Sequence, residues 1–185
     1  MRVIAGQARG TKLTALPGEE ITRPTIDRVK EAMFSAVQFQ IPGARVLDLF
    51  AGSGQLGIEA LSRGAQRCIF CDQNPQAVEV IKSNCKAAGV FRQSLVVQME
   101  ARALLAGTKE RFDLALLDPP YRRGTLADIL PLVAEVMAPN GTVLCESEPQ
   151  AVLPEQAGTL VLKKQYRYGT VLVSRYQNES GEESE

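Results

Sequence analysis

The stretch Val46-Leu-Asp-Leu-Phe-Ala-Gly-Ser-Gly-Gln-Leu-Gly57 decides the fold of this chain. Its apolar first part is typical of a strand, and the glycines that follow predict a turn that opens a helix. The same order of strand and helix recurs along the chain, which is typical of an α/β fold with a doubly wound, mostly parallel sheet. The predicted strands are 45–50, 67–72, 94–98, 112–117 and 142–146, and the predicted helices between them are 55–63, 75–88, 101–106 and 124–137.

The two ends of the chain depart from this alternation. Residues 159–165 and 169–176 alternate apolar and polar side chains, which predicts an antiparallel hairpin at the sheet edge and brings the sheet to seven strands. Residues 1–20 predict a small β-hairpin or extended arm, and Thr25 is placed to cap the helix that follows. Residues 178–185 hold four acids and no base, which predicts a disordered tail. We therefore expect an N-terminal extension at 1–40, a main domain at 41–177 and an acidic tail at 178–185.

The composition limits the location and the chemistry. The 185 residues suit one domain, and no apolar run approaches the ~20 residues of a membrane span. The N-terminus lacks the apolar stretch of a signal peptide, so we expect a cytoplasmic protein without membrane contact. The absence of histidine excludes a Ser-His-Asp or Cys-His nucleophile, a histidine base and a histidine metal ligand. Cys68 and Cys71 are spaced as Cys-x-x-Cys, but they lie in a predicted strand and would face opposite sides of the sheet, so no metal site is expected.

A second motif follows another predicted strand. Leu114-Ala-Leu-Leu117 is wholly apolar, and Asp118-Pro119-Pro120-Tyr121 after it must turn the chain, because proline cannot continue a strand. Open α/β sheets bind ligands outside the carboxyl ends of their strands. This turn offers a carboxylate, carbonyl oxygens and an aromatic ring. Such a set suits a flat base with an exocyclic amine, because the ring can stack on the base and the oxygens can accept the amine protons.

The glycine turn is compatible with two kinds of ligand. Gly52-Ser-Gly54-Gln-Leu-Gly57, with Asp72 at the end of the next strand, matches the dinucleotide fingerprint of nicotinamide-binding oxidoreductases. However, Asp48 precedes the glycines, and its carboxylate would repel a pyrophosphate at the helix N-terminus. The same carboxylate suits S-adenosylmethionine, which carries an amino-acid end and a sulfonium charge. Asp72 would then accept hydrogen bonds from both ribose hydroxyls, and Glu100, with the Ala101 N–H nearby, would meet the adenine amine.

Basic residues gather in a few places, although the formal net charge is zero. Without the acidic tail, the chain is net positive by four. These clusters fit contact with the phosphates of a nucleic acid, and on charge alone an ordinary solvated surface explains them equally well. The predicted substrate contacts are Arg2, Arg9, Lys12, Arg23, Thr25, Arg122 and Arg123.

These motifs together carry a family resemblance. Residues 46–64 and Asp118-Pro-Pro-Tyr121 resemble the class I S-adenosylmethionine-dependent amino-methyltransferases, which have a Rossmann-like fold. Arg2-Val-Ile-Ala-Gly-Gln-Ala-Arg-Gly-Thr-Lys-Leu13 and Thr22-Arg-Pro-Thr-Ile-Asp-Arg-Val-Lys-Glu-Ala-Met-Phe34 resemble, more narrowly, the bacterial RsmD family. That resemblance implies methylation of guanine N2 in 16S ribosomal RNA, with S-adenosylmethionine as cofactor and the small ribosomal subunit or its assembly intermediate as partner. Glu100 departs from the family pattern, in which an aspartate is commoner.

Three functions therefore stand at this point. The resemblance favours the rRNA methyltransferase, a DNA adenine-N6 methyltransferase shares both motifs, and a NAD-binding oxidoreductase shares the glycine motif. For the first, we expect the Asp118 side chain and the Pro119 carbonyl to accept the amine protons, and Tyr121 to stack on the base. The predicted cofactor-binding residues are Asp48, Phe50, Ala51, Gly52, Ser53, Gly54, Asp72, Gln73, Glu100 and Ala101.

Overall fold

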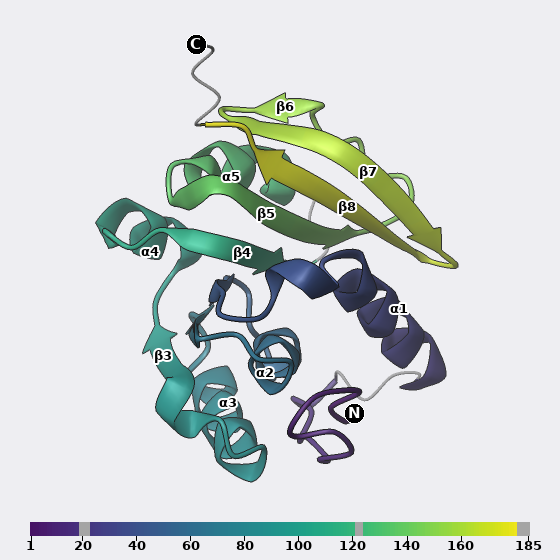
Figure 1. The fold of residues 1–185 in the computed structure, drawn as a ribbon, viewed down its shortest axis with the longest axis vertical. Coiled ribbons are helices and arrows are strands. Elements are labelled where there is room, and N and C mark those ends of the chain that lie inside the picture. The colour runs from purple at the N-terminus through teal and green to yellow at the C-terminus, as the bar shows by residue number, and fades with distance from the viewer. Residues whose placement is uncertain (19–22, 121–123, 181–185) are drawn as a thin grey trace.

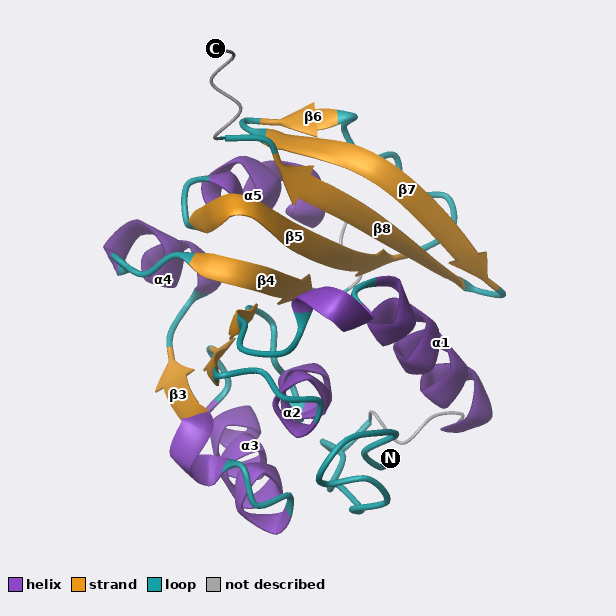
Figure 2. Ribbon diagram, viewed as in Figure 1, coloured by secondary structure: helices purple, strands orange, loops and turns teal. Residues whose placement is uncertain are grey.

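A computed structural model describes residues 1–18, 23–120 and 124–180, and it gives the backbone alone for residues 23–26. Figures 1 and 2 show a curved sheet with helices packed against it. The helices are α1 (Arg23–Ala36), α2 (Gln55–Ser62), α3 (Pro75–Ala87), α4 (Ala101–Gly107) and α5 (Thr125–Ala134), with short 3₁₀ turns η1 (Gln38–Gln40) and η2 (Phe91–Gln93). The strands are β1 (Arg45–Asp48), β2 (Arg67–Asp72), β3 (Ser94–Gln98), β4 (Phe112–Leu117), β5 (Met137–Ser147), β6 (Gln156–Ala157), β7 (Leu160–Tyr168) and β8 (Val171–Asn178).

The strands form one sheet in the order β3-β2-β1-β4-β5-β8-β7-β6. Neighbours from β3 to β5 pair in parallel, whereas β8, β7 and β6 pair antiparallel. The described strands thus make a mixed, mostly parallel sheet with antiparallel strands at its C-terminal end. The expected number of seven strands was wrong, because β6 adds an eighth. That strand has only two residues, Gln156 and Ala157, which is too short to show an alternating pattern in the sequence.

The two faces of the sheet bury separate cores. On one face, Leu114 and Leu116 of β4 belong to a cluster that includes residues of α1, α2 and α3. On the other face, Ala115 and Leu117 belong to a cluster that includes residues of α4 and α5. Helices therefore cover both faces, which is the doubly wound arrangement that we predicted. The central strands are almost wholly apolar because neither of their faces meets water.

The predicted end of helix α5 and the predicted start of β5 were both wrong. The Pro139-Asn-Gly141 turn, expected between helix and strand, instead lies inside β5. Met137 already pairs with Phe112, and the register then shifts so that Leu114 pairs with Thr142. Asn140 takes a φ of 60° at this irregularity, a conformation that asparagine tolerates better than most residues. Turn-forming residues here therefore make a bulge within a strand.

The N-terminal arm (residues 1–14) is hairpin-like, as expected, but it pairs by a single antiparallel bridge between Arg2 and Lys12. The Val3 N–H donates to the Thr11 carbonyl and the Leu13 N–H donates to the Met1 carbonyl, which supports this bridge. The helix that follows begins at Arg23, so the prediction of Thr25 as its N-cap was wrong. Because proline fits the first turn of a helix, Pro24 does not stop the helix from starting before it.

The start of the acidic tail also differs from the expectation. Asn178 ends β8 and is fully buried, with its Nδ2 donating to the carbonyl oxygens of Met137 and Ala138 at 3.2 and 3.0 Å. The Glu179 N–H donates to the Thr159 carbonyl. The tail therefore cannot begin at residue 178, and residues 181–185 lie outside the described residues. No helix in the described part of the chain is both long and apolar enough to cross a membrane.

Candidate active site

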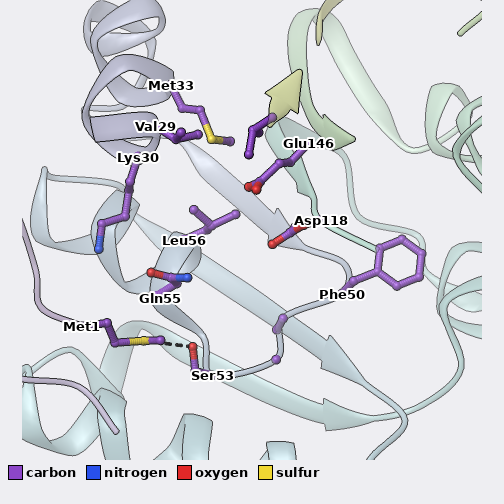
Figure 3. A pocket seen from close by; sticks show the side chains of 13 residues that line it. Met1, Val29, Lys30, Met33, Phe50, Ser53, Gln55, Leu56, Asp118 and Glu146 are labelled. Carbon is purple, nitrogen blue, oxygen red and sulfur yellow. Dashed lines mark hydrogen bonds between the residues drawn. The ribbon is translucent and has the colours of Figure 1, made fainter. Parts of the chain in front are cut away.

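The order of the strands reverses beside β1. The chain runs from β1 outward through β2 to β3 and then returns to place β4 on the other side of β1. In open α/β sheets, such a reversal leaves a crevice at the carboxyl ends of the strands. Two cavities lie at this point, the Asp72 cavity of about 680 Å³ and the Met33 cavity of about 260 Å³ (Figure 3). The residues that line both cavities are Phe50, Gly52, Asp118 and Glu146.

The glycine turn is held by the end of the neighbouring strand. Gly52 and Gly54 have φ angles of 56° and 81°, in the left-handed region that favours glycine. The Gly52 N–H donates to Oδ2 of Asp72 at 2.9 Å, and the Asn74 N–H donates to Oδ1 at 2.9 Å. A Cβ atom on Gly57 would lie 2.3 Å from the Phe70 ring. The glycines therefore let the turn and α2 approach β2 closely while Asp72 remains in the cavity wall.

Asp48 lies beneath this turn and does not line either cavity. Its side chain is buried, with Oδ2 accepting the Gly57 N–H at 3.0 Å. Its Oδ1 is buried without a hydrogen-bond partner among the described residues. Burial raises the pKa of Asp48 to about 7, and the negative charge of Asp72 adds to this effect while the Gly57 hydrogen bond opposes it. Asp48 thus supports the turn from below, and the structure does not bring it to the cavity surface with the other predicted cofactor residues.

Most of the other predicted cofactor residues do meet at the two cavities. Glu100 lies in the Asp72 cavity wall and also caps α4, because its Oε2 accepts the Ala103 N–H at 3.2 Å. Gly54 lines neither cavity, and its N–H donates to the Ala51 carbonyl at 2.7 Å. The Asp72 cavity is lined by Phe50, Gly52, Asp72, Gln73, Glu100 and Ala101, and the Met33 cavity by Phe50, Ala51, Gly52 and Ser53.

The Asp72 cavity suits a nucleoside that carries a charged chain. Its volume lies within the range of about 300–1,000 Å³ that is usual for small-molecule sites. Asp72 and Glu100 offer acceptor oxygens for hydroxyl and amine groups, while Leu49, Phe50 and Met99 supply apolar walls for a flat ring. These acceptor oxygens and apolar walls therefore fit S-adenosylmethionine.

The Asp118 turn stands where the two cavities meet. Asp118 directly follows β4 and is half-buried, Pro119 is buried and Pro120 is exposed. Both prolines line the Asp72 cavity. Figure 3 shows the carboxylate of Asp118 pointing into the Met33 cavity, on the same side as that of Glu146. Tyr121, Arg122 and Arg123 lie outside the described residues.

The predicted nucleic-acid contacts are spread along the arm. Arg2, Arg9 and Lys12 are exposed, and Nε of Arg2 lies 3.6 Å from Oδ2 of Asp27 on α1. Nothing is described for the side chains of Arg23 and Thr25. The arm therefore offers cations to solvent, one of them already next to an acid.

Among the described residues of the arm, only the first lines one of these two cavities. Met1 lines the Met33 cavity, and Leu16, just after the arm, lines the Asp72 cavity. The middle of the arm instead docks on the far end of α2, where the Gln7 N–H donates to the carbonyl of Ser62 at 2.8 Å. Arg9 follows that docking point, so the structure places it away from the cavity rim.

One buried glutamate on α2 joins the arm to α1. Glu59 is fully buried and accepts the N–H groups of Ile4 and Ala5, each at 3.0 Å. Its Oε1 also accepts Nε of Arg63 at 3.0 Å, and its Oε2 lies 3.4 Å from Nζ of Lys30. Burial lowers the pKa of Lys30, although the charge of Glu59 opposes that shift. This group of residues is called the Glu59 cluster below.

The sequence reasoning missed several residues of the site. Glu146 lines both cavities but was given no role. The signal that could have found it is its position, since an acid at the carboxyl end of a central parallel strand faces the crevice. The residues of α1 that line the Met33 cavity were also given no role at the site, namely Val29, Lys30 and Met33.

Known proteins resemble this chain over nearly its whole length. The model of the family described as "Conserved hypothetical protein 95" matches residues 1–177. "Putative rRNA methyltransferase YlbH" of Bacillus subtilis (strain 168) is 41% identical over 182 residues, which cover 96% of this chain and 98% of YlbH. "Ribosomal RNA small subunit methyltransferase D" of Escherichia coli (strain K12) is 34% identical over 189 residues, which cover 100% of this chain and 93% of that protein.

A solved structure has the same fold over nearly the same length. The hypothetical protein TTHA0928 of Thermus thermophilus superposes with a TM-score of 0.81 at 26% identity, covering 95% of this chain and 98% of that chain. The match thus covers nearly the whole length of both chains. This chain belongs to the RsmD/YlbH family, whose family model is described as "Conserved hypothetical protein 95".

Proposed function

We propose that this protein transfers the methyl group of S-adenosylmethionine to the exocyclic N2 of a guanine in 16S ribosomal RNA. The observation that carries this proposal is the meeting of the two cavities at Asp118. One cavity has the acids and apolar walls for the cofactor, and the other opens on the same carboxylate from the side of α1. The names of the full-length relatives, YlbH and the E. coli methyltransferase, support an rRNA substrate.

The cofactor side of the proposal rests on the polar groups around the glycine turn. Asp72 holds the turn through Gly52 and can still accept hydrogen bonds from ribose hydroxyls at its remaining lone pairs. A dinucleotide would instead place its pyrophosphate at this turn, above the buried Asp48. In its ionised form Asp48 would repel that group, because both are negative. The positively charged S-adenosylmethionine is therefore favoured over a nicotinamide dinucleotide.

The chemistry of transfer requires little from the protein beyond orientation. When bound, S-adenosylmethionine supplies a methyl group activated by its sulfonium. The guanine amine is a weak nucleophile because its lone pair is delocalised into the ring. The Asp118 carboxylate and the Pro119 carbonyl would accept its two protons, which favours the pyramidal nitrogen of the transition state. The positive charge that develops on this nitrogen is also stabilised by the carboxylate.

No base is needed before transfer, which suits a chain without histidine. The N2–methyl bond forms as the sulfur–methyl bond breaks, and the resulting ammonium is acidic enough to lose its proton afterwards. Alignment of the amine with the methyl group supplies much of the remaining acceleration. Tyr121 is expected to stack on the target base, with about 1–3 kcal/mol by analogy with other base–aromatic contacts.

The partner in this proposal is the small ribosomal subunit or one of its assembly intermediates, in the cytoplasm. The test is to compare 16S rRNA from cells with and without this protein by mass-spectrometric mapping of methylated nucleosides. We expect one N2-methylguanosine to disappear when the protein is absent and to return when the purified enzyme and S-adenosylmethionine are added to the particles. Unchanged rRNA together with loss of N6-methyladenine from DNA would overturn the proposal in favour of the DNA methyltransferase.

A further inference from the structure

Glu146 stands beside Asp118 at the carboxyl ends of two neighbouring parallel strands. Leu117 of β4 pairs with Cys145 of β5, so the next residue on each strand, Asp118 and Glu146, lies one register step further along. Adjacent strands are about 4.8 Å apart. Both residues line the Asp72 cavity and the Met33 cavity, and Figure 3 shows both carboxylates directed into the Met33 cavity.

Glu146 has apolar neighbours on the side of the Met33 cavity. Val29 and Met33 of α1, Leu56 of α2 and Val171 of β8 share the Met33 cavity with it. Its own side chain is half-buried. A carboxylate is costly in such a place unless a donor group offsets the lost hydration, so this acid is suited to a ligand that brings a hydrogen-bond donor.

The amino edge of guanine offers two donors that suit two neighbouring carboxylates. Guanine presents N1–H directly beside the N2 amine, so donors lie side by side in the plane of the base. Adenine presents an unprotonated N1 beside its N6 amine. This nitrogen is an acceptor, so its lone pair would repel the lone pairs of a carboxylate oxygen. An ionised carboxylate is acceptor-only, so a second acid beside the amine site separates the two purines.

We propose that Glu146 accepts the N1–H of the target guanine while Asp118 accepts from its N2 amine. This inference rests on the proposed function and identifies the residue that restricts it to guanine. The second hydrogen bond also fixes the in-plane rotation of the base, so that N2 faces the methyl donor. A site built for a donor rejects a base that lacks one, because its own buried polar group is then left unpaired.

The test uses an RNA in which the mapped target guanosine is replaced by 2-aminopurine riboside, reconstituted into small-subunit particles. 2-Aminopurine keeps the N2 amine but has no N1–H. We expect the wild-type enzyme to transfer methyl to guanine at least tenfold faster than to 2-aminopurine in single turnovers. Glu146→Gln should reduce this ratio towards one, because an amide can donate to N1 of 2-aminopurine. Glu146→Ala should also reduce it, by removing the acceptor.

Glu148→Gln provides the matched control. This acid lies two residues further along the chain. It lines neither the Asp72 cavity nor the Met33 cavity but a neighbouring cavity of about 640 Å³, so its variant should keep the wild-type ratio. Binding of S-adenosylhomocysteine at wild-type affinity shows that each variant is folded. Equal ratios in wild type, Glu146→Gln and Glu146→Ala, with N2-methylguanosine as the product, would overturn the role of Glu146 alone. Transfer by the wild-type enzyme to adenine N6 would overturn both this role and the proposed function.

Discussion

Two buried acids, Glu59 and Asp48, have opposite surroundings. Glu59 is surrounded by donors, since two arm N–H groups and Arg63 bond to it and Lys30 lies close. Asp48 is also buried, but it accepts one N–H, and burial with a second acid nearby raises its pKa. Glu59 therefore stabilises the fold. Asp48 lowers the stability of the folded protein but lies next to the ligand site, and such a cost to stability is common at functional sites.

The largest effect on stability is expected from the removal of Glu59, which tests whether this acid stabilises the fold. Glu59→Ala should lower the free energy of unfolding by about 3–5 kcal/mol, because it leaves Lys30 as an uncompensated buried charge. Urea denaturation measures the change. The control is Glu110→Ala, which removes an acid from the half-exposed pair with Arg67 and should cost less than about 1 kcal/mol. Similar losses in both variants would mean that the Glu59 cluster contributes no more than a surface pair.

Asp118 should affect the reaction far more than the fold. Asp118→Ala should lower single-turnover methyl transfer by ~100-fold or more, the loss expected when a transition-state hydrogen-bond partner is removed. Cofactor affinity should stay close to that of wild type. Asp113→Ala, at the other end of β4 where Asp113 pairs with Arg45, is the control and should keep the rate. A near wild-type rate in Asp118→Ala would show that the amine is oriented by other groups.

Asp72 should affect cofactor binding. Asp72→Ala should weaken S-adenosylmethionine binding by roughly 1.5–3 kcal/mol for each charge-assisted hydrogen bond lost, measured by calorimetry. Because Asp72 also accepts the Gly52 N–H, Asp72→Asn is needed to separate the two roles, since the amide oxygen can still hold the turn. An unchanged affinity in folded Asp72→Ala would remove this residue from the cofactor site.

Substitution of Asp48 should raise the stability of the protein, whereas substitution of Glu59 should lower it. Its pKa of about 7 lies above its ordinary value of 3.8, so the folded protein binds the extra proton and loses stability as the pH rises between these values. Asp48→Asn should therefore be more stable than wild type above pH 7, by at least about 1 kcal/mol, which corresponds to less than one pKa unit. The gain should shrink towards pH 4 and then vanish.

The comparison acid for this measurement is Asp113. Burial raises its pKa, but the hydrogen bonds from Arg45 outweigh that effect and lower it on balance. Its ionised form therefore contributes stability that is present above the unfolded pKa and lost as the pH falls through the folded pKa. Asp113→Asn should lose stability at neutral pH. Thermal unfolding from pH 4 to 8 measures both variants, and a gain for Asp48→Asn that does not depend on pH would contradict the raised pKa.

The smallest effect concerns the arm. Replacing Arg9 and Lys12 by alanine should weaken binding to the RNA substrate and flatten its salt dependence by about 0.7 in the logarithmic slope for each lost contact with single-stranded RNA. Cofactor affinity should not change. Because the structure places Arg9 away from the cavity rim, Lys12→Ala alone should account for much of any effect at the target nucleotide. An identical salt slope in the double variant would leave these cations as solvated surface groups.

The sequence predicted those parts of the molecule that depend on local pattern. The parallel strands, the glycine turn and the acids at strand ends follow from short-range periodicity and from the edge where parallel strands finish. It could not predict that Asp48 lies under the turn, because this depends on how closely Gly57 packs against Phe70. The role of Glu59 was also hidden, since its partners come from the arm and α1, far away in the chain.

The arm also has a consequence for how the molecule assembles. Its N–H groups bond to residues far along the chain, Ala8 to Ser62 and Thr14 to Asn84, with separations of 54 and 70 residues. Asn84 in turn donates to the Ser53 carbonyl in the glycine turn. During synthesis the arm emerges before the elements it docks on, so it waits unpaired until α3 has left the ribosome. The docking of the arm thus depends on contacts between distant parts of the chain, which form more slowly than local ones.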